Sequence, residues 1–238
     1  MDYSILQNGL KEVGLNMLSE FQLDQFDQYY RFLIEKNKVM NLTTITDPEE
    51  VQTKHFLDSL MCLKTGLLNK NIHVIDVGTG AGFPGIPLKI ACPDIHLTLA
   101  DSLNKRIRFL NEVIEMLQLE NVEAVHGRAE DLGRNDKHRE QYDVCVSRAV
   151  SNLNTLLEYC TPFVKVEGYF VAYKSGEIDG ELTKASSAMK KLGCILDKVE
   201  YFNIPGSDIS RSFVIIRKVK HTLNTYPRKA GTPQKEPL

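Results

Sequence analysis

The sequence contains no tryptophan, few cysteines and no long uninterrupted run of apolar residues. Its five cysteines, at positions 62, 92, 145, 160 and 194, are odd in number and at least fifteen residues apart. That spacing fits neither a disulfide framework nor a CxxC metal site, so we expect reduced and mostly buried thiols. No apolar stretch approaches the ~20 residues that a membrane-spanning helix needs, so we expect no membrane partner.

Two further classes of feature are absent. The start of the chain, MDYSILQNGLKEVG, has neither the charged segment nor the apolar core of a secretory signal, which predicts a cytoplasmic protein. The six histidines form no HxxxH pair and no Cys/His cluster, so we expect no metal site. His55 in particular is expected to be a packed helix residue.

Charge is unevenly distributed along the chain. The formal net charge is −2, yet residues 217–238 carry six Lys or Arg against one acid, which makes that segment +5 and the remainder −7. The last residues are also rich in Pro and Gly, so we expect residues 220–238 to leave the globule as an extended basic arm.

The first part of the chain has helical periodicity. Ser19 followed by Gln22 forms a capping-box pattern before apolar residues spaced as in a helix up to residue 40. Asp47 and Pro48 then provide the cap and first residue of another helix. Residues 1–68 are therefore predicted to be a helical leader packed on the core.

From residue 71 onward, short β-branched runs alternate with helical patterns. This alternation predicts a doubly wound α/β domain over residues 69–219, with a Rossmann-like parallel sheet covered on both faces. The last two strands are separated by a Pro-Gly-Ser loop and are expected to form an antiparallel edge pair. The predicted strands are 73–77, 96–101, 122–127, 142–147, 168–174, 194–202 and 211–218.

The stretch DVGTGAGFPGIP, residues 76–87, lies where the first strand passes into the first helix. Residues 80–85 spell the GxGxxG of dinucleotide-binding folds, a weak match alone, whereas the acid-led DxGxGxG starting at Asp76 is typical of AdoMet methyltransferases. A carboxylate there would repel a pyrophosphate and attract an ammonium group, which AdoMet has and NAD lacks. The turn therefore favours AdoMet.

Acids at the ends of the next two strands can complete a nucleoside site. Asp101 could accept hydrogen bonds from both ribose hydroxyls, or could only cap the next helix. Ala129 and Glu130 could read the adenine edge through a backbone N–H and a carboxylate, or Glu130 could be an exposed acid at a helix start.

The fourth strand brings Ser147 and Arg148 to the same rim but offers no familiar catalytic group. The acidic or amide, double-proline and aromatic pattern of amino-group methylases is missing, and Cys145 lies inside the strand rather than beside a proline. A ring nitrogen with a free lone pair needs only alignment, so no catalytic residue is assigned. Arg148 is expected to orient the cofactor or a phosphate, or to form an interstrand salt bridge.

Basic residues could surround this rim and hold a polyanion by its phosphates. The alternative is a solvated face with a disordered end. The RNA-binding candidates are Lys54, Lys105, Arg106, Lys174, Arg228 and Lys229.

Seven segments between residues 41 and 233 resemble the RsmG/GidB family: NLTTIT, KHFLDSL, VIDVGTGAGFPGIPLKI, LADSLNKRIRFL, GRAED, YDVCVSRAVSNL and YPRKAGTP. The resemblance implies a class I AdoMet-dependent methyltransferase fold. It also implies methylation of 16S rRNA at guanine N7 in the 530 loop, nucleotide 527 by the family's convention, by a monomer acting on the 30S subunit or an assembly intermediate. The cofactor contacts it implies are Gly78, Phe83, Ala129, Glu130 and Arg148, to which the argument above adds Asp76, Gly80 and Asp101.

The residues leave other functions open. An NAD-linked dehydrogenase, a catalytically silent RNA-binding module, and a methyltransferase acting on another RNA or on a small molecule are each compatible with a glycine-rich turn in a doubly wound sheet.

Overall fold

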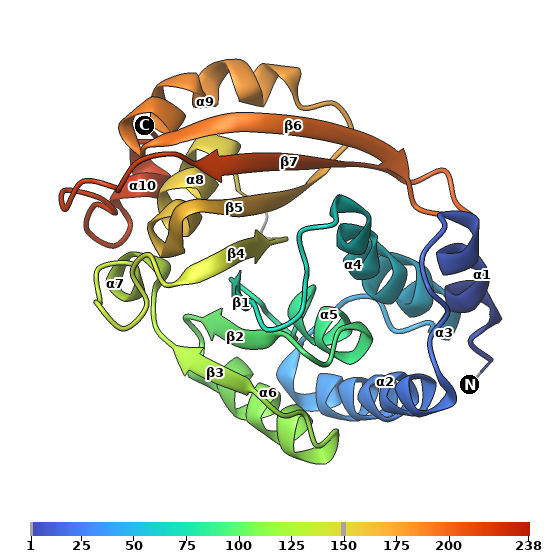
Figure 1. Cartoon of the computed structure of the whole chain (residues 1–238). Helices are drawn as coiled ribbons and strands as arrows, with labels where there is room; N and C mark the ends of the chain where they lie inside the picture. The colour runs from blue at the N-terminus through green and yellow to red at the C-terminus, as the bar shows by residue number, and fades with distance from the viewer. Residues whose placement is uncertain (1, 149–150) are drawn as a thin grey trace.

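A computed structural model describes residues 2–148 and 151–238 and contains one seven-stranded sheet in the order β3-β2-β1-β4-β5-β7-β6 (Figure 1). Strands β1 to β5 are parallel, and β7 is antiparallel to both of its neighbours. The strands are β1 (His73–Val77), β2 (His96–Asp101), β3 (Val122–His126), β4 (Tyr142–Ser147), β5 (Val164–Ser175), β6 (Cys194–Asn203) and β7 (Ser210–Lys218). The predicted mostly parallel sheet with an antiparallel edge pair is confirmed. Ala149 and Val150 of the motif YDVCVSRAVSNL lie outside the described residues.

The prediction differs at β5, which begins at Val164 rather than at residue 168. Val164 pairs with Tyr142, and the register then shifts before Val144 pairs with Tyr169. Glu167, between these two pairs in β5, has a φ of 70°.

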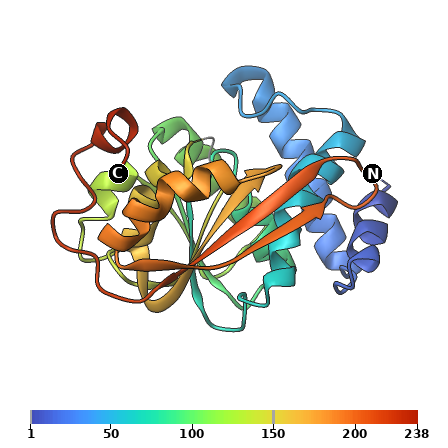
Figure 2. The same ribbon diagram turned by 90° about the horizontal axis from the view of Figure 1, so that it is seen from above.

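Helices lie on both faces of the sheet, and the two termini lie at opposite ends of the molecule (Figures 1 and 2). The α-helices are α1 (Ser4–Glu12), α2 (Glu20–Met40), α3 (Pro48–Val51), α4 (Asp58–Leu60), α5 (Gly85–Ala91), α6 (Asn104–Met116), α7 (Ala129–Leu132), α8 (Leu153–Cys160), α9 (Asp179–Lys191) and α10 (Thr232–Lys235). A π-helical turn, Gln52–Leu57, joins α3 to α4, and 3₁₀ turns cover Met61–Thr65 and Thr161–Phe163. Among the described residues, no helix combines the length and hydrophobicity that crossing a membrane needs.

Both predicted helix starts in the leader are confirmed. The Ser19 side chain accepts from the backbone N–H of Gln22, and the Gln22 side chain accepts from the backbone N–H of Ser19, which completes the capping box. Asp47 accepts from the N–H groups of Glu49 and Glu50, each at 3.0 Å. These bonds satisfy donors that a helix start otherwise leaves without partners.

Strand residues alternate between two hydrophobic clusters. Val74, Val144 and Val171 pack with helices α1, α2, α5 and α6, whereas Ile75 and Cys145 pack with α8 and α9 on the other face. Successive side chains of a strand point to opposite faces, so each strand serves both clusters. The five thiols are free, and all but that of Cys92 are buried.

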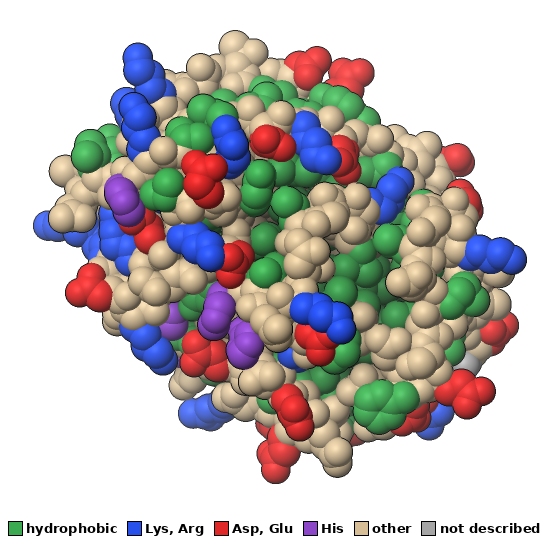
Figure 3. All heavy atoms as spheres, viewed as in Figure 1, with side chains coloured by type: hydrophobic (Ala, Val, Ile, Leu, Met, Phe, Trp, Pro, Cys, Tyr) green, Lys and Arg blue, Asp and Glu red, His purple; other side chains and the backbone are tan. Residues whose placement is uncertain are grey.

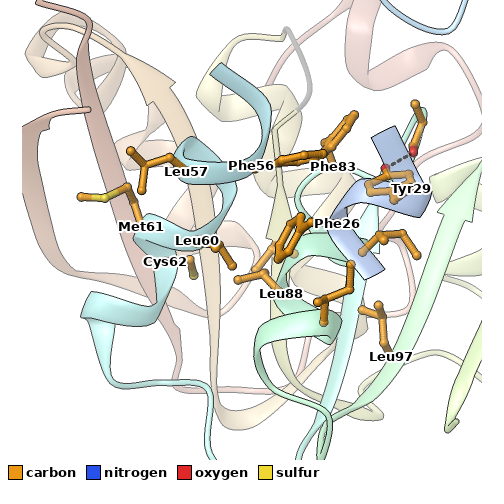
Figure 4. Packing of buried hydrophobic residues seen from close by; sticks show 14 of the residues in the cluster. Phe26, Tyr29, Phe56, Leu57, Leu60, Met61, Cys62, Phe83, Leu88 and Leu97 are labelled. Atoms are coloured by element: carbon orange, nitrogen blue, oxygen red, sulfur yellow. Dashed lines mark hydrogen bonds between the residues drawn. The ribbon is translucent and has the colours of Figure 1, made fainter. Parts of the chain in front are cut away.

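The helical leader shares the first cluster rather than forming a core of its own. In Figure 4, Phe26 and Tyr29 of α2 and Phe56 of the π-helical turn gather against Phe83 of the glycine turn. The Phe26, Tyr29 and Phe56 side chains are fully buried. The leader therefore fixes the back of the glycine turn.

The prediction that the last residues leave the globule as an extended arm is wrong. Arg228 donates to the carboxylate of the fully buried Glu158, the backbone N–H of Gly231 donates to Glu130 at 2.8 Å, and α10 packs on α8. Composition indicated an extended arm, because it carries no information about Glu158 and Glu130, the distant acids to which Arg228 and Gly231 bond.

The Arg228–Glu158 pair gives a test of this docking. Arg228→Ala should lower the free energy of unfolding by about 3 kcal/mol, because it leaves a buried carboxylate without its cation. The neighbouring exposed cation, Lys229, provides the control. Lys229→Ala should change the free energy of unfolding by less than about 0.5 kcal/mol. Urea unfolding measures both, and equal values for the two variants would show that the segment is not held by this pair.

Candidate active site

A cavity of about 730 Å³ lies at the carboxyl ends of β1 to β4. The sheet order reverses at β1, which has β2 on one side and β4 on the other, and such a switch point is where doubly wound sheets bind ligands. The glycine turn forms one wall, while Thr43 and His55 of the leader and Gly231 of the C-terminal segment also line the cavity.

Most backbone N–H groups of the glycine turn are bonded within the protein, and that of Ala81, which lines the cavity, is the exception among residues 78–83. Those of Gly78 and Thr79 donate to Ala100, and that of Gly80 donates to the Asp101 carboxylate at 3.0 Å. The N–H groups of residues 82 and 83 donate to the Thr79 carbonyl, and that of residue 85 donates to Asp76. A dinucleotide's pyrophosphate binds to free N–H groups at this position, so the bonding pattern disfavours NAD.

The glycines in this turn serve two purposes. A Cβ on Gly82 would lie 2.9 Å from the Tyr29 hydroxyl, and one on Gly85 would lie 2.9 Å from the Asp76 carboxylate. At Gly80, where φ is +63°, a Cβ would meet nothing within 4 Å. Gly82 and Gly85 are therefore required by internal packing, whereas Gly80 faces the cavity with its backbone exposed to a ligand.

Direct binding of the cofactor's ammonium group by Asp76 stays a prediction, and the buried Oδ1 of Asp76 has no hydrogen-bond partner among the described residues. Its side chain is fully buried and does not line the cavity; one carboxylate oxygen accepts from the Thr79 hydroxyl and the Gly85 N–H. Burial raises its pKa to about 6. Asp76 therefore organises the turn from beneath.

The Asp101 carboxylate bonds to the start of α6, one of the two roles that the sequence left open, and the ribose contact stays a prediction. One oxygen accepts from the N–H of Leu103 at the start of α6, and the other accepts from the Gly80 N–H and from Arg106. Asp101 is only 3% exposed but lines the cavity, so its remaining lone pairs suit hydroxyl donors such as those of a ribose.

Ala129 and Glu130 begin the short helix α7 and line the same cavity. Glu130 is buried rather than exposed, and one of its oxygens accepts from the N–H of Gly231. The carboxylate thus connects the nucleoside side of the cavity to the C-terminal segment.

His55, Phe83 and Arg148 form a stack on the opposite side of the cavity. The His55 and Phe83 rings lie 4.4 Å apart at 19°, and the Arg148 guanidinium lies 5.2 Å from the centre of the Phe83 ring. Arg148 also forms an ion pair with Asp58, its Nη1 3.0 Å from the carboxylate. The salt-bridge partner therefore comes from the leader and not from a neighbouring strand.

The bonding of His55 defines its charge state. Its Nδ1 accepts from Arg148 Nη2 at 3.2 Å, because a guanidinium can only donate, so the ring proton lies on Nε2 and is donated to the Thr43 hydroxyl at 2.8 Å. Burial and the Arg148 charge lower the pKa of His55 to about 3. His55 is thus neutral and has no lone pair available to act as a general base.

The predicted cations do not form one ring. Arg106 is paired with Asp101, Lys105 donates to the Met40 carbonyl, and Lys174 donates to Ser151 and pairs with Glu181. Arg228 is bound to Glu158, as described above, and Lys229 is exposed. Lys54 lines a second cavity together with Lys174. On the face in Figure 3, acidic and basic side chains are interspersed, so any polyanion site there is local.

Seven of the eight residues predicted to bind the cofactor line the cavity: Gly78, Gly80, Phe83, Asp101, Ala129, Glu130 and Arg148. Sequence reasoning missed Thr43, Asp58, Arg211 and Gly231, and it treated His55 as packing alone. Thr43 and Asp58 lie in the segments NLTTIT and KHFLDSL, which were the only signal available for them.

Comparison with known proteins identifies the family. The family model for rRNA small subunit methyltransferase G matches residues 22–213. The chain belongs to the rRNA small subunit methyltransferase G family. The family member from Desulforamulus reducens is 51% identical over 98% of this chain and 97% of its own length. The one from Lachnoclostridium phytofermentans is 50% identical over 100% of this chain and 98% of its own length.

Solved structures support the fold class. M. jannaschii TYW2 in complex with AdoMet aligns with a TM-score of 0.53 at 16% identity, over 68% of this chain and 77% of that chain. At this identity the likeness shows the fold alone. The class I methyltransferase fold implied by the sequence is confirmed.

Tyr29 provides a test of how the leader shapes the cavity. Its buried hydroxyl donates to the Ala81 carbonyl at 2.5 Å (Figure 4). Tyr29→Phe should raise the Kd for AdoMet about fivefold, or about 1 kcal/mol, because the turn loses this brace. Tyr30→Phe removes a bond to Thr46 away from the turn and should leave the Kd unchanged. Calorimetric titration compares them, and equal Kd values for both variants would exclude the brace.

Asp76 gives a pH-dependent prediction. Its folded pKa is raised, so the folded protein keeps the proton to higher pH than the unfolded chain does. Tighter binding of this proton by the folded state adds to the free energy of unfolding below about pH 4. That contribution is lost as the pH rises through about 6. Relative to Asp76→Asn, the wild type should therefore lose about 2 to 3 kcal/mol of unfolding free energy between pH 4 and pH 6.5. A wild-type-minus-variant difference that stays constant across this range in urea titrations would refute the shift.

Proposed function

We propose that this protein transfers a methyl group from AdoMet to N7 of a guanine in the 530 loop of 16S rRNA. Membership of the rRNA small subunit methyltransferase G family, along nearly the whole chain, carries this proposal. The bonding of the glycine turn supports AdoMet as the methyl donor, because most of the N–H groups that would hold a pyrophosphate already have acceptors.

The residues around the cavity fit the parts of AdoMet. Asp101 suits the ribose hydroxyls, Ala129 and Glu130 suit the adenine edge, and Gly78 and Gly80 line the cavity where the amino-acid end would lie. When bound, AdoMet supplies an electrophilic methyl group on a sulfonium. Asp76 keeps the turn in shape through one oxygen, and its other oxygen has no hydrogen-bond partner among the described residues.

The protein's contribution to the reaction is alignment. Guanine N7 carries a lone pair, so no group has to remove a proton before it accepts a methyl, and holding reactants in line can supply about 7 to 11 kcal/mol of the barrier reduction. His55 is neutral with its Nδ1 already bonded, which agrees with a reaction that needs no base. Cys145 is buried, and its thiol pKa is raised well above normal by burial and by Cys160, so it does not serve as a nucleophile.

We extend the proposal to the setting of the reaction. The protein acts in the cytoplasm as a monomer on the 30S subunit or an assembly intermediate. A dehydrogenase is disfavoured by the bonded turn, and a silent RNA-binding module would not need a cavity fitted to a nucleoside.

Ligand choice is tested by thermal stability. AdoMet at 100 times its Kd should stabilise the folded protein by about 2.7 kcal/mol, because a ligand that binds only the folded state adds its binding free energy. NADH at the same concentration should leave the melting temperature unchanged. Stabilisation by NADH without stabilisation by AdoMet would contradict the proposed cofactor.

The reaction is tested by transfer of label from [methyl-³H]AdoMet to unmethylated small subunits and to stripped 16S rRNA. We expect incorporation at one guanine of the 530 loop, located by chemical cleavage at N7-methylguanine. Label on small molecules without RNA, or at another position of the rRNA, would overturn the assignment.

A further inference from the structure

A second cavity, of about 840 Å³, adjoins the first. The two share His55, Arg148 and Gln234 as lining residues, so only one layer of side chains separates them. The volume lies within the range of sites that enclose a small ligand, and it is large enough for one nucleotide.

Four cations and two carboxylates line this second cavity, which gives the lining a net charge of +2. Lys174 is paired with Glu181 and Lys54 with Glu50, which leaves Arg148 and Arg211, both held by Asp58, as the guanidiniums that a ligand would meet. The cations are Lys54, Arg148, Lys174 and Arg211, and the carboxylates are Asp58 and Glu181.

Asp58 joins two of these cations from beneath. Its residue is 1% exposed; one oxygen accepts from Arg148 Nη1 and the other from Arg211 Nε, each at 3.0 Å. The three residues come from α4, from the end of β4 and from β7. Because both guanidiniums bond to the same buried carboxylate, they are held side by side despite the repulsion between their positive charges.

We propose that Asp58 holds Arg148 and Arg211 as a paired guanidinium site for a phosphodiester of the RNA strand at the acceptor nucleotide. This inference rests on the proposed function and adds where the substrate strand lies. Asp58 is a positioning residue, and Arg211 is a substrate-binding residue that lines the second cavity but not the first.

The chemistry of the pair points to a phosphate. Guanidiniums match phosphate oxygens geometrically, and, among the described residues, Nη2 of Arg211 has no hydrogen-bond partner and remains available. A concave site of nucleotide size suits an unpaired or extruded nucleotide rather than a duplex groove. A strand held there would lie beside His55 and Phe83, with its base directed at the shared wall.

Arg211→Gln tests this site, and Arg217→Gln on the same strand is the matched control. Arg217 pairs with Glu167, away from both cavities, and its replacement makes the same change in charge on β7. Both enzymes are assayed with [methyl-³H]AdoMet and unmethylated small subunits, and AdoMet binding is measured separately by calorimetry. RNA binding is followed at several salt concentrations.

For Arg211→Gln we expect a KM for the small subunit about tenfold higher, with the Kd for AdoMet unchanged. The slope of log affinity against log salt should fall by about one unit, since one phosphate contact is lost. Arg217→Gln should match the wild type in all three measurements. Asp58→Asn should also raise the KM for the small subunit, because it frees both guanidiniums from their fixed positions.

Two results would overturn the inference while the proposed function stands. Identical KM and salt slope for Arg211→Gln and Arg217→Gln would show that no phosphate binds to the pair. A loss of AdoMet affinity in Arg211→Gln that accounts for the whole defect would assign the pair to the cofactor. If the wild type transfers no methyl to any RNA, the proposed function itself fails, and this inference fails with it.

Discussion

The shape of the site depends on the hydrogen bonds that the glycine turn between β1 and α5 makes within the protein. Ala100, Asp101, Thr79 and Asp76 supply acceptors for N–H groups that many doubly wound folds direct at a phosphate. Helix α5, which follows the turn, has only seven residues, and Pro84 before it and Pro87 within it donate no N–H. A turn closed in this way leaves few N–H groups for a phosphate, which suits a ligand without phosphates.

Segments far apart in the sequence complete this wall. Tyr29 of α2 holds the back of the turn, and His55 stacks on Phe83 at its side. From the other end of the chain, Gly231 donates to Glu130 across the nucleoside side of the cavity. The central sheet positions the turn, but the leader and the C-terminal segment give the cavity its shape.

Most of the fold could be predicted from the sequence, because it depends on local patterns. β1, β2 and β4 have the predicted bounds, since β-branched runs between glycines and helical patterns define strands well. The start of β5 was missed, because Val164 is specified by its partner Tyr142 across the sheet rather than by its neighbours in sequence.

The site was less predictable where side chains from distant segments meet. The motif correctly indicated the place of Asp76 but not its burial, which depends on Thr79 and Gly85 closing over it. The basic residues were counted as free charges, whereas Arg106 and Arg228 are held by acids 5 and 70 residues away. Charge counts do not show pairing, so a paired cation cannot be distinguished from a free one before the fold is known.

Most of the turn's N–H groups are bonded internally before any ligand arrives, and the site depends on these bonds. Native-state amide hydrogen exchange of the ligand-free protein measures this directly at Gly78, Thr79, Gly80 and Gly85. Our account predicts strong protection at these four amides without AdoMet and little further change when it binds. Rapid exchange in the free protein, with protection only after ligand is added, would contradict the account.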